Sequence, residues 1–262
     1  MTTTSARDLV PRHGRAPRRA GGPAVYTAIG VLGELLITLG FLVLAFLVWQ
    51  LWWTDVEGNQ AQAEIVESLP WAPPPAAAAG ESDEATPVVA APRRDEPPVM
   101  PEPGHAVTFA TLQVPRWSDE PERPVSQGVD RPTVLDVLGI GHYPETAMPG
   151  AIGNFSLAGH RTTYGKPFNR IAELQDGDPI VVRTADTWYV YRVTSSAVVT
   201  PQDVQVIDPV PGQPGVEPTE RVITLTTCHP MFSARERYIV HGVLDYWAPV
   251  ADGSPAEILG GA

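Results

Sequence analysis

The chain contains a single cysteine, Cys228, at a position where a thiol could act as a nucleophile. It follows residues 221–227, RVITLTT, a run with the β-branched content of a strand, and His229 comes directly after it. Active groups are often presented where a strand opens into a loop. The alternative is an inert cysteine in the core, and composition alone favours that alternative.

His160 is the second candidate, because it ends another apolar, strand-like run within LAGHRTTYG. Acyl transfer by a thiol needs a group that protonates the leaving amine, and a histidine can do this. A lone histidine at a strand end is more often structural. His229 is the rival, although neighbouring side chains on a strand point to opposite faces. The remaining histidines have weaker claims: His13, His105, His142 and His241.

Arg237 opens the run RYIVHG, which we expect to pair with residues 221–227 as a hairpin through HPMFSARE. Such pairing would bring a guanidinium beside Cys228, where it could favour the thiolate and stabilise an oxyanion. Arg235 lies on the same face by strand alternation, and could instead be a solvated charge. The histidines and the cysteine lack the paired spacing of a zinc site, so we expect no metal and no cofactor.

Residues 25–53 predict a transmembrane helix, since they are almost wholly apolar and longer than the ~20 residues that a span needs. Three tryptophans crowd the end of the run, which suits an uncleaved signal anchor better than a cleaved signal peptide. Residues 1–24 form a basic tail with five arginines, and acids follow the span. We therefore expect a single-pass protein of the cell membrane with a cytoplasmic N-terminus and an extracellular C-terminal part.

Residues 54–106 are rich in proline, alanine and acids, and predict a disordered linker. Docking of Trp71 as a lid is the alternative. Residues 107–248 contain short β-rich runs separated by Gly/Pro turns, which predict an all-β barrel or sandwich. Residues 249–262 are expected to be a flexible C-terminal tail.

One stretch of the predicted domain has helical spacing, with Phe168, Ile171 and Leu174 placed to pack on the core.

The net charge of −12 argues against nucleic-acid binding. We find no glycine-rich phosphate loop, internal repeat or second spanning segment. Arginine far outnumbers lysine, and the heavy use of Ala, Pro and Val suggests a GC-rich, bacterial genome.

Three stretches of the sequence resemble the sortase family, most closely the class E sortases of Gram-positive actinobacteria. The nucleophile motif TLxTC matches TLTTC at residues 224–228, the AGHR motif contains His160, and Arg237 opens the next strand. The class E patterns GHYPGTALPG, GNFALAGHRTTYG.PFNRL and TLTTCHP.FSARERLIV correspond to residues 141–150, 153–171 and 224–240. Glu145 replaces a usual glycine and Met148 a usual leucine, both outside the catalytic trio.

The resemblance implies a closed sortase β-barrel of about eight strands with short helices in its loops. It also implies that Cys228 attacks the threonyl carbonyl of an LPXTG-like sorting signal, commonly LAXTG in class E, and forms a thioester. His160 would protonate the leaving amine and deprotonate the incoming one. Arg237 would stabilise the oxyanion, and the acceptor would be a peptidoglycan amine.

We further expect Thr227, Arg235 and Tyr164 to contact the substrate. The expected partners are surface proteins with C-terminal sorting signals, the peptidoglycan amine, and membrane lipid around the N-terminal helix. A pilus-polymerising sortase is one alternative, although the sequence lacks its lid motif and C-terminal span. A membrane-tethered cysteine hydrolase is another, because water can also resolve a thioester, and a non-catalytic wall-binding module is the third.

Overall fold

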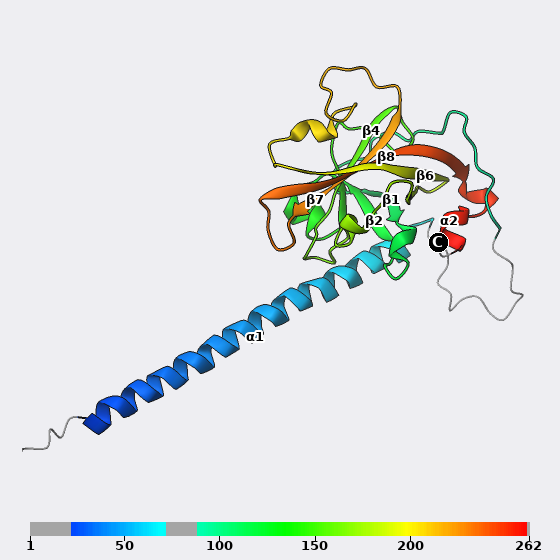
Figure 1. The fold of residues 1–262 in the computed structure, drawn as a ribbon. Coiled ribbons are helices and arrows are strands. Elements are labelled where there is room, and N and C mark those ends of the chain that lie inside the picture. The colour runs from blue at the N-terminus through cyan, green and yellow to red at the C-terminus, as the bar shows by residue number, and fades with distance from the viewer. Residues whose placement is uncertain (1–21, 72–87, 261–262) are drawn as a thin grey trace, which may run out of the picture. The chain divides into compact units, whose positions relative to one another are not determined.

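The computed structural model describes residues 22–71 and 88–260, and the remaining residues lie outside the description (Figure 1). Contacts divide the chain into two units, Met1–Gln50 and Leu51–Ala262, and each is treated separately below. The first unit contains most of the apolar run. The second contains the barrel and the C-terminal end of the helix that begins in the first unit.

Helix α1 extends over Gly22–Ser68. Among the described residues it is the one helix long and apolar enough to cross a membrane. Its side chains before residue 50 are largely exposed, among them Leu35, Phe41 and Val48. An apolar surface without protein partners suits a lipid environment. The span expected at residues 25–53 lies within this helix, which continues well past the end of the span.

The eight strands of the second unit close into a barrel in the order β1-β2-β3-β4-β7-β8-β6-β5, which confirms the predicted fold. The strands are β1 (Thr108–Gln113), β2 (Arg123–Gln127), β3 (Ile140–His142), β4 (Gly153–Ala158), β5 (Pro179–Arg183), β6 (Thr187–Val199), β7 (Arg221–His229) and β8 (Glu236–Pro249). Two neighbouring pairs are parallel, β2 with β3 and β4 with β7. Parallel pairing sets the ends of β4 and β7 at the same rim of the barrel.

Short helices occupy the loops, as predicted. They are η2 (Pro115–Trp117), η3 (Arg131–Leu135), η4 (Ile171–Glu173), η5 (Val204–Ile207), η6 (Val250–Asp252) and α2 (Ala256–Leu259). Phe168, Ile171 and Leu174 are buried in the core, as their spacing predicts. The chain there forms only the single turn η4, because packing on the core and the turn that follows both restrict the length of the segment.

The linker prediction for residues 54–106 is wrong at both ends of that range. Residues 54–68 are helical, and residues 88–106 run along the barrel, where Arg93 bridges to Trp247 by backbone hydrogen bonds. The hydroxyl of Tyr189 donates to the Pro98 carbonyl at 2.6 Å. A proline-rich chain can therefore be fixed by contacts of its carbonyls without forming a core of its own. Residues 72–87 lie outside the described part.

Trp71 is docked on the barrel, but not as the lid considered above. Its indole lies 5.1 Å from the guanidinium carbon of Arg183, and the same guanidinium lies 5.1 Å from the ring of Trp188. Arg183 also donates to the Trp71 carbonyl at 2.7 Å. Trp71 therefore holds the end of the helical segment against the β5–β6 turn, rather than covering the rim that carries Cys228.

The flexible tail predicted for residues 249–262 is also wrong as far as residue 260. Helices η6 and α2 lie in this segment, and the backbone of Ser254 bonds to that of Val88 and of Ala90. Glu257 accepts a hydrogen bond from Tyr246 and forms an ion pair with Arg192. The sequence offered little apolar signal here because the contacts are mainly polar.

His142 is a core residue at the end of β3. It is fully buried, with its Nδ1 2.7 Å from Gln127 Oε1 and its Nε2 2.9 Å from the hydroxyl of Thr146. Nε2 also lies 3.1 Å from the Ala147 carbonyl, so both ring nitrogens have protein partners. Burial lowers the pKa of His142 from 6.5 to about 4, because the charged form is poorly solvated there.

Acid should therefore destabilise the fold through His142. The unfolded chain takes up the proton below about pH 6.5 and the folded chain only near pH 4, so stability is lost as the pH falls between these values. We expect His142→Gln to lose about 2 kcal/mol less than the wild type between pH 7 and pH 5. Urea unfolding of the full chain in detergent measures this, and equal losses in the two proteins would contradict the assignment.

Candidate functional site

Cys228 and Arg237 face each other across the β7–β8 hairpin. They are directly paired in the antiparallel register, so their side chains share one face of the sheet. Cys228 is partly exposed. Arg237 Nη1 donates to the carbonyls of Ala234 at 3.1 Å and Glu236 at 2.9 Å, which holds the guanidinium at the turn. The predicted hairpin is confirmed, and it brings a cation to the face of the thiol.

His160 comes to the same rim through the parallel pairing of β4 with β7. The last register pair is Ala158 with Thr226, and the Gly159 amide donates to the Thr226 carbonyl at 3.2 Å. If this register continued by two residues, His160 would lie beside Cys228. The parallel pairing thus directs the chain that carries His160 toward the end of β7.

The imidazole of His160 is held by two groups. Its Nε2 donates to Asp136 Oδ1 at 2.6 Å, and its ring lies 5.1 Å from the ring of Tyr164 at an angle of 35°. Asp136 follows η3, and its carboxylate also receives a bond from Arg131 Nε at 3.3 Å. Because Nε2 is bonded to Asp136, Nδ1 is the ring nitrogen that remains available for a contact at the rim of the barrel.

Sequence reasoning missed Asp136, which lies 24 residues before His160 and belongs to a loop without regular periodicity. Only the distance in space identifies it. It also missed Arg161, although this residue stands directly after His160 in the AGHR motif. Its position next to a candidate residue within the motif is the signal that could have identified Arg161.

Arg161 explains why His229 is not the proton-transfer candidate. Its buried guanidinium donates from Nη1 to His229 Nδ1 at 2.7 Å and to the Cys228 carbonyl at 3.4 Å. It also lies 5.4 Å from the ring of Tyr238. His229 thus serves as a hydrogen-bond acceptor for a fixed cation. Two guanidinium groups, from Arg161 and Arg237, flank the strand end that carries the thiol.

The three residues expected to contact substrate have different positions. Thr227 is buried, and its hydroxyl donates to the Gly159 carbonyl at 2.7 Å, so it clamps β7 to the end of β4. Tyr164 lies against His160. Arg235 is exposed and precedes the start of β8, so the strand alternation that linked it to Arg237 does not extend to it.

A small cavity of about 100 Å³ adjoins the rim on the side of Arg237. Its walls come from the end of β7, the start of β8 and the segment around η5, with these residues among them: Tyr143, Val204, Ile207, Thr226 and Ile239. The Tyr143 hydroxyl lies 3.1 Å from the hydroxyl of Thr226. Polar side chains that include Asp203 and Arg237 also line it, so an aliphatic side chain of an extended peptide could contact its apolar part.

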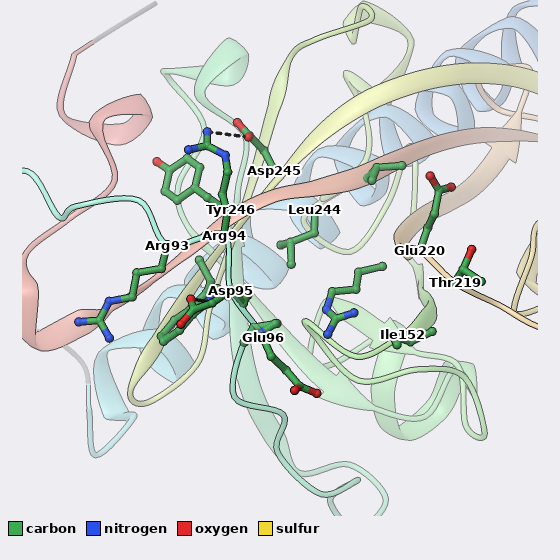
Figure 2. A pocket seen from close by; sticks show the side chains of 14 residues that line it. Arg93, Arg94, Asp95, Glu96, Ile152, Thr219, Glu220, Leu244, Asp245 and Tyr246 are labelled. Atoms are coloured by element: carbon green, nitrogen blue, oxygen red, sulfur yellow. Dashed lines mark hydrogen bonds and ion pairs between the residues drawn. The ribbon is translucent and has the colours of Figure 1, made fainter.

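A larger cavity of about 560 Å³ lies elsewhere, and half of the residues that line it are charged (Figure 2). It includes Arg221, the first residue of β7, whereas Cys228 is near the last. At about 3.3 Å per residue, the two positions are roughly 23 Å apart along the strand. Arg94 and Asp245 are paired within it at 3.0 Å. This cavity is therefore separate from the rim of Cys228.

Among the described residues, no group of three or more His, Cys, Asp or Glu side chains is arranged so that it could hold a metal ion. The rim instead combines a thiol, an imidazole with a carboxylate partner, and a permanent cation. A closed β-barrel with this set at one rim defines a class of cysteine acyl-transfer enzyme.

Comparison with known proteins identifies the family. The sortase domain model matches residues 112–245, and the chain belongs to the sortase family. Sortases are transpeptidases. The curated relatives include Sortase SrtE1 of Streptomyces coelicolor, 39% identical over 255 residues, and Sortase SrtE2 of the same organism, 34% identical over 249 residues. These alignments cover 94% and 93% of this chain, but 65% of SrtE1 and 92% of SrtE2.

Solved structures agree with this assignment. The SrtA sortase from Actinomyces oris has 45% identity and a TM-score of 0.62, covering 65% of this chain and 97% of that one. Sortase E1 from Streptomyces coelicolor, solved with a tripeptide in its active site, has 44% identity and a TM-score of 0.54, covering 58% and 97%. The chain thus resembles the class E sortases, as its motifs predict.

Asp136→Asn should slow turnover of a sorting peptide, because the carboxylate that orients His160 is lost while the side-chain shape is kept. We expect kcat to fall by about 10–100-fold, with KM within about twofold. Steady-state kinetics measures both. Arg131→Gln is the matched control, since it removes the other partner of Asp136 and leaves the bond to His160. An unchanged kcat in Asp136→Asn would contradict the orienting role.

Proposed function

We propose that the protein is a membrane-anchored cysteine transpeptidase that cleaves an LPXTG- or LAXTG-like sorting signal between Thr and Gly. It transfers the cleaved surface protein to an amine of peptidoglycan. The observation that supports the proposal is the pairing of Cys228 with Arg237 in the β7–β8 register, together with the parallel pairing of β4 with β7, which leads the chain toward His160.

In the first half-reaction, the sulfur of Cys228 attacks the threonyl carbonyl carbon, and the carbonyl oxygen becomes an oxyanion. Arg237 donates hydrogen bonds to that oxygen, and its charge persists at any relevant pH. The bond from carbon to the glycine nitrogen then breaks. His160 gives its proton to the leaving amine, and a thioester remains on Cys228.

In the second half-reaction, the amine of a peptidoglycan precursor or cross-bridge attacks the thioester. His160 takes the proton from the incoming amine, and the sulfur of Cys228 leaves as a thiolate as the new amide bond forms. The cavity beside Arg237 supports recognition of an aliphatic residue of the signal. Arg235 and Tyr164 remain proposed substrate contacts, whereas the clamped hydroxyl of Thr227 supports only a backbone role.

The apolar part of α1 supports membrane anchoring. We propose that it spans the cell membrane once, with the arginine-rich residues 1–24 in the cytoplasm and the barrel outside, because basic residues are retained on the cytoplasmic side. Sorting signals at the C-termini of secreted surface proteins, and peptidoglycan amines, are then both on the side of the barrel.

Transfer can be separated from hydrolysis with a labelled LAXTG peptide, incubated with the full chain with and without an amine acceptor. We expect the amide product to increase with acceptor concentration, because the amine competes with water for the thioester. Mass spectrometry identifies the products. Formation of the free acid alone at every acceptor concentration would instead indicate a membrane-tethered hydrolase.

The roles of Arg237 and Arg235 can be compared directly. Arg237→Ala should lower kcat/KM by about 10²–10³-fold, as expected for loss of an oxyanion donor. Arg235→Ala is the comparison, because it removes an exposed cation of the same loop that we propose only contacts the substrate, and its effect should stay within about threefold. Cys228→Ala should form no thioester adduct. Equal losses in the two arginine variants would contradict a specific role of Arg237.

A further inference from the structure

The end of α1 packs closely against the loop that follows His160. A Cβ atom on Gly58 would lie 2.5 Å from the amide nitrogen of Gly165 and 2.5 Å from the carbonyl carbon of Tyr164. Only glycine allows two backbones to approach this closely. These residues all belong to the compact unit that begins at Leu51. The helix thus packs tightly against this loop and does not act only as a spacer.

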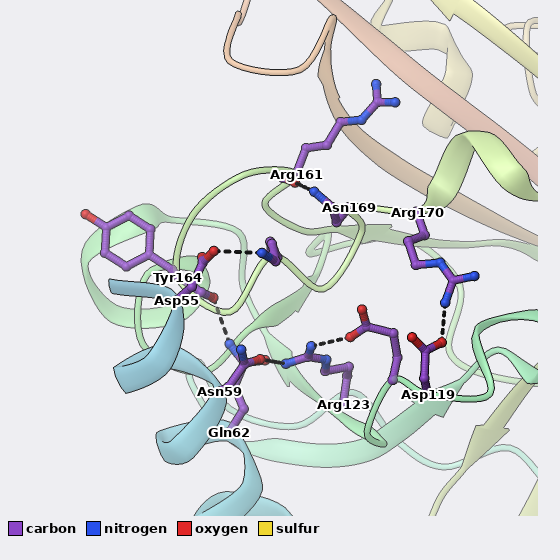
Figure 3. A network of polar contacts seen from close by, with 11 residues as sticks. Asp55, Asn59, Gln62, Asp119, Arg123, Arg161, Tyr164, Asn169 and Arg170 are labelled. Carbon is purple, nitrogen blue, oxygen red and sulfur yellow. Dashed lines mark hydrogen bonds and ion pairs between the residues drawn. The ribbon is translucent and has the colours of Figure 1, made fainter. Parts of the chain in front are cut away.

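Gln62 adds a polar contact to the same loop. Its side chain is buried, with 2% exposed, and its Nε2 donates to the Tyr164 carbonyl at 2.9 Å. Its Oε1 accepts from Arg123 Nη1 at 2.9 Å (Figure 3). Both ends of the buried amide are therefore used. Loss of this side chain would leave the Tyr164 carbonyl and the buried Arg123 each without one partner.

The backbone of the loop requires such support. Three successive residues have positive φ: Tyr164 at 54°, Gly165 at 75° and Lys166 at 39°. Tyrosine and lysine are unfavourable in this region and stay there only when the surroundings fix them. Residues on one face of α1 contact all three. Gln62 bonds to Tyr164, Gly58 packs on Gly165, and Asp55 forms an ion pair with Lys166 at 2.9 Å.

The supported loop in turn contacts the imidazole of His160. The ring of Tyr164 lies 5.1 Å from the ring of His160. A hollow of about 220 Å³ next to this pair is lined by Gly58 and Ala61 of α1 together with Asp136 and Tyr164. Both groups that hold the histidine therefore border the helix.

We propose that residues 55–62 of α1 are a positioning element for His160, acting through residues 164–166. The proposal deepens the proposed function and rests on it for the effect on catalysis. Asp55, Gly58 and Gln62 touch no reacting atom, so they are positioning residues. The helix that follows the apolar span is, on this proposal, a working part of the catalytic domain.

Gly58→Ala in the full chain in detergent tests the proposal. The added methyl group must push α1 from the loop, although alanine favours the helix itself. Gly33→Ala in the same helix is the matched control, because a Cβ there meets nothing within 4 Å. We expect Gly58→Ala to lower kcat for the labelled peptide by about 10-fold, with KM within about twofold, while Gly33→Ala changes neither.

A second readout does not depend on activity. The imidazole resonances of His160, assigned by comparison with His160→Gln, should shift in Gly58→Ala and stay in place in Gly33→Ala. Asp55→Asn provides a milder variant that keeps the side-chain shape and breaks the ion pair with Lys166. We expect it to shift the same resonances and lower kcat by about threefold, again at constant KM. Thermal unfolding identifies the variants that fold.

Unchanged His160 resonances in folded Gly58→Ala and Asp55→Asn would overturn the proposal. So would a loss of kcat in Gly33→Ala equal to that in Gly58→Ala, since the effect would then lie in the apolar part of the helix. If Gly58→Ala does not fold, Asp55→Asn decides alone. Absence of peptide transfer by the wild type, with resonances that still shift, would refute the proposed function and leave the positioning contact intact.

Discussion

The parallel pairing of β4 with β7 is the constraint on which the site depends. Two parallel strands end at the same edge, so residues that follow them are brought together however distant they are in sequence. Here the pair joins the loop of His160 to the strand of Cys228, and Thr227 locks the two ends through the Gly159 carbonyl. The antiparallel hairpin then adds Arg237. The barrel wall itself therefore sets the relative positions of the three groups.

Around this rim the protein uses fixed cations and bonded carboxylates. Arg161 is buried beneath the end of β7 and bonds to His229, while Asp136 bonds to His160. Buried charges of this kind need partners, and each partner restricts the geometry of the residue that it pairs with. The rim is held in shape before a peptide arrives. Such preorganisation favours a transition state over a flexible ground state.

The barrel could be predicted from the sequence because its signals are local, whereas the roles of Cys228, His160 and Arg237 stay predictions. Short β-branched runs indicate strands, and strand-end positions of Cys228 and His160 indicate a shared rim. The linker and tail could not be predicted in the same way, because residues 88–106 and Glu257 are fixed by polar contacts to distant strands. Low apolar content indicates the lack of a core, but it does not indicate the lack of partners. Asp136 was missed for a related reason, because its contact with His160 depends on how the chain folds and leaves no local pattern in the sequence.

The closure of the barrel also limits how an extended peptide can be held. Each of the eight strands has a neighbour on both sides over part of its length, although the end of β6 pairs only with β8, since its register with β5 stops at Arg192. Many peptide-binding domains gain affinity by accepting the ligand as an additional strand, and the fully paired part of this wall leaves no place for one. Recognition along that part must then come from side-chain pockets and loops at the rim. Discrimination between related peptides should accordingly follow the shape and polarity of each side chain more than the length of the extended segment.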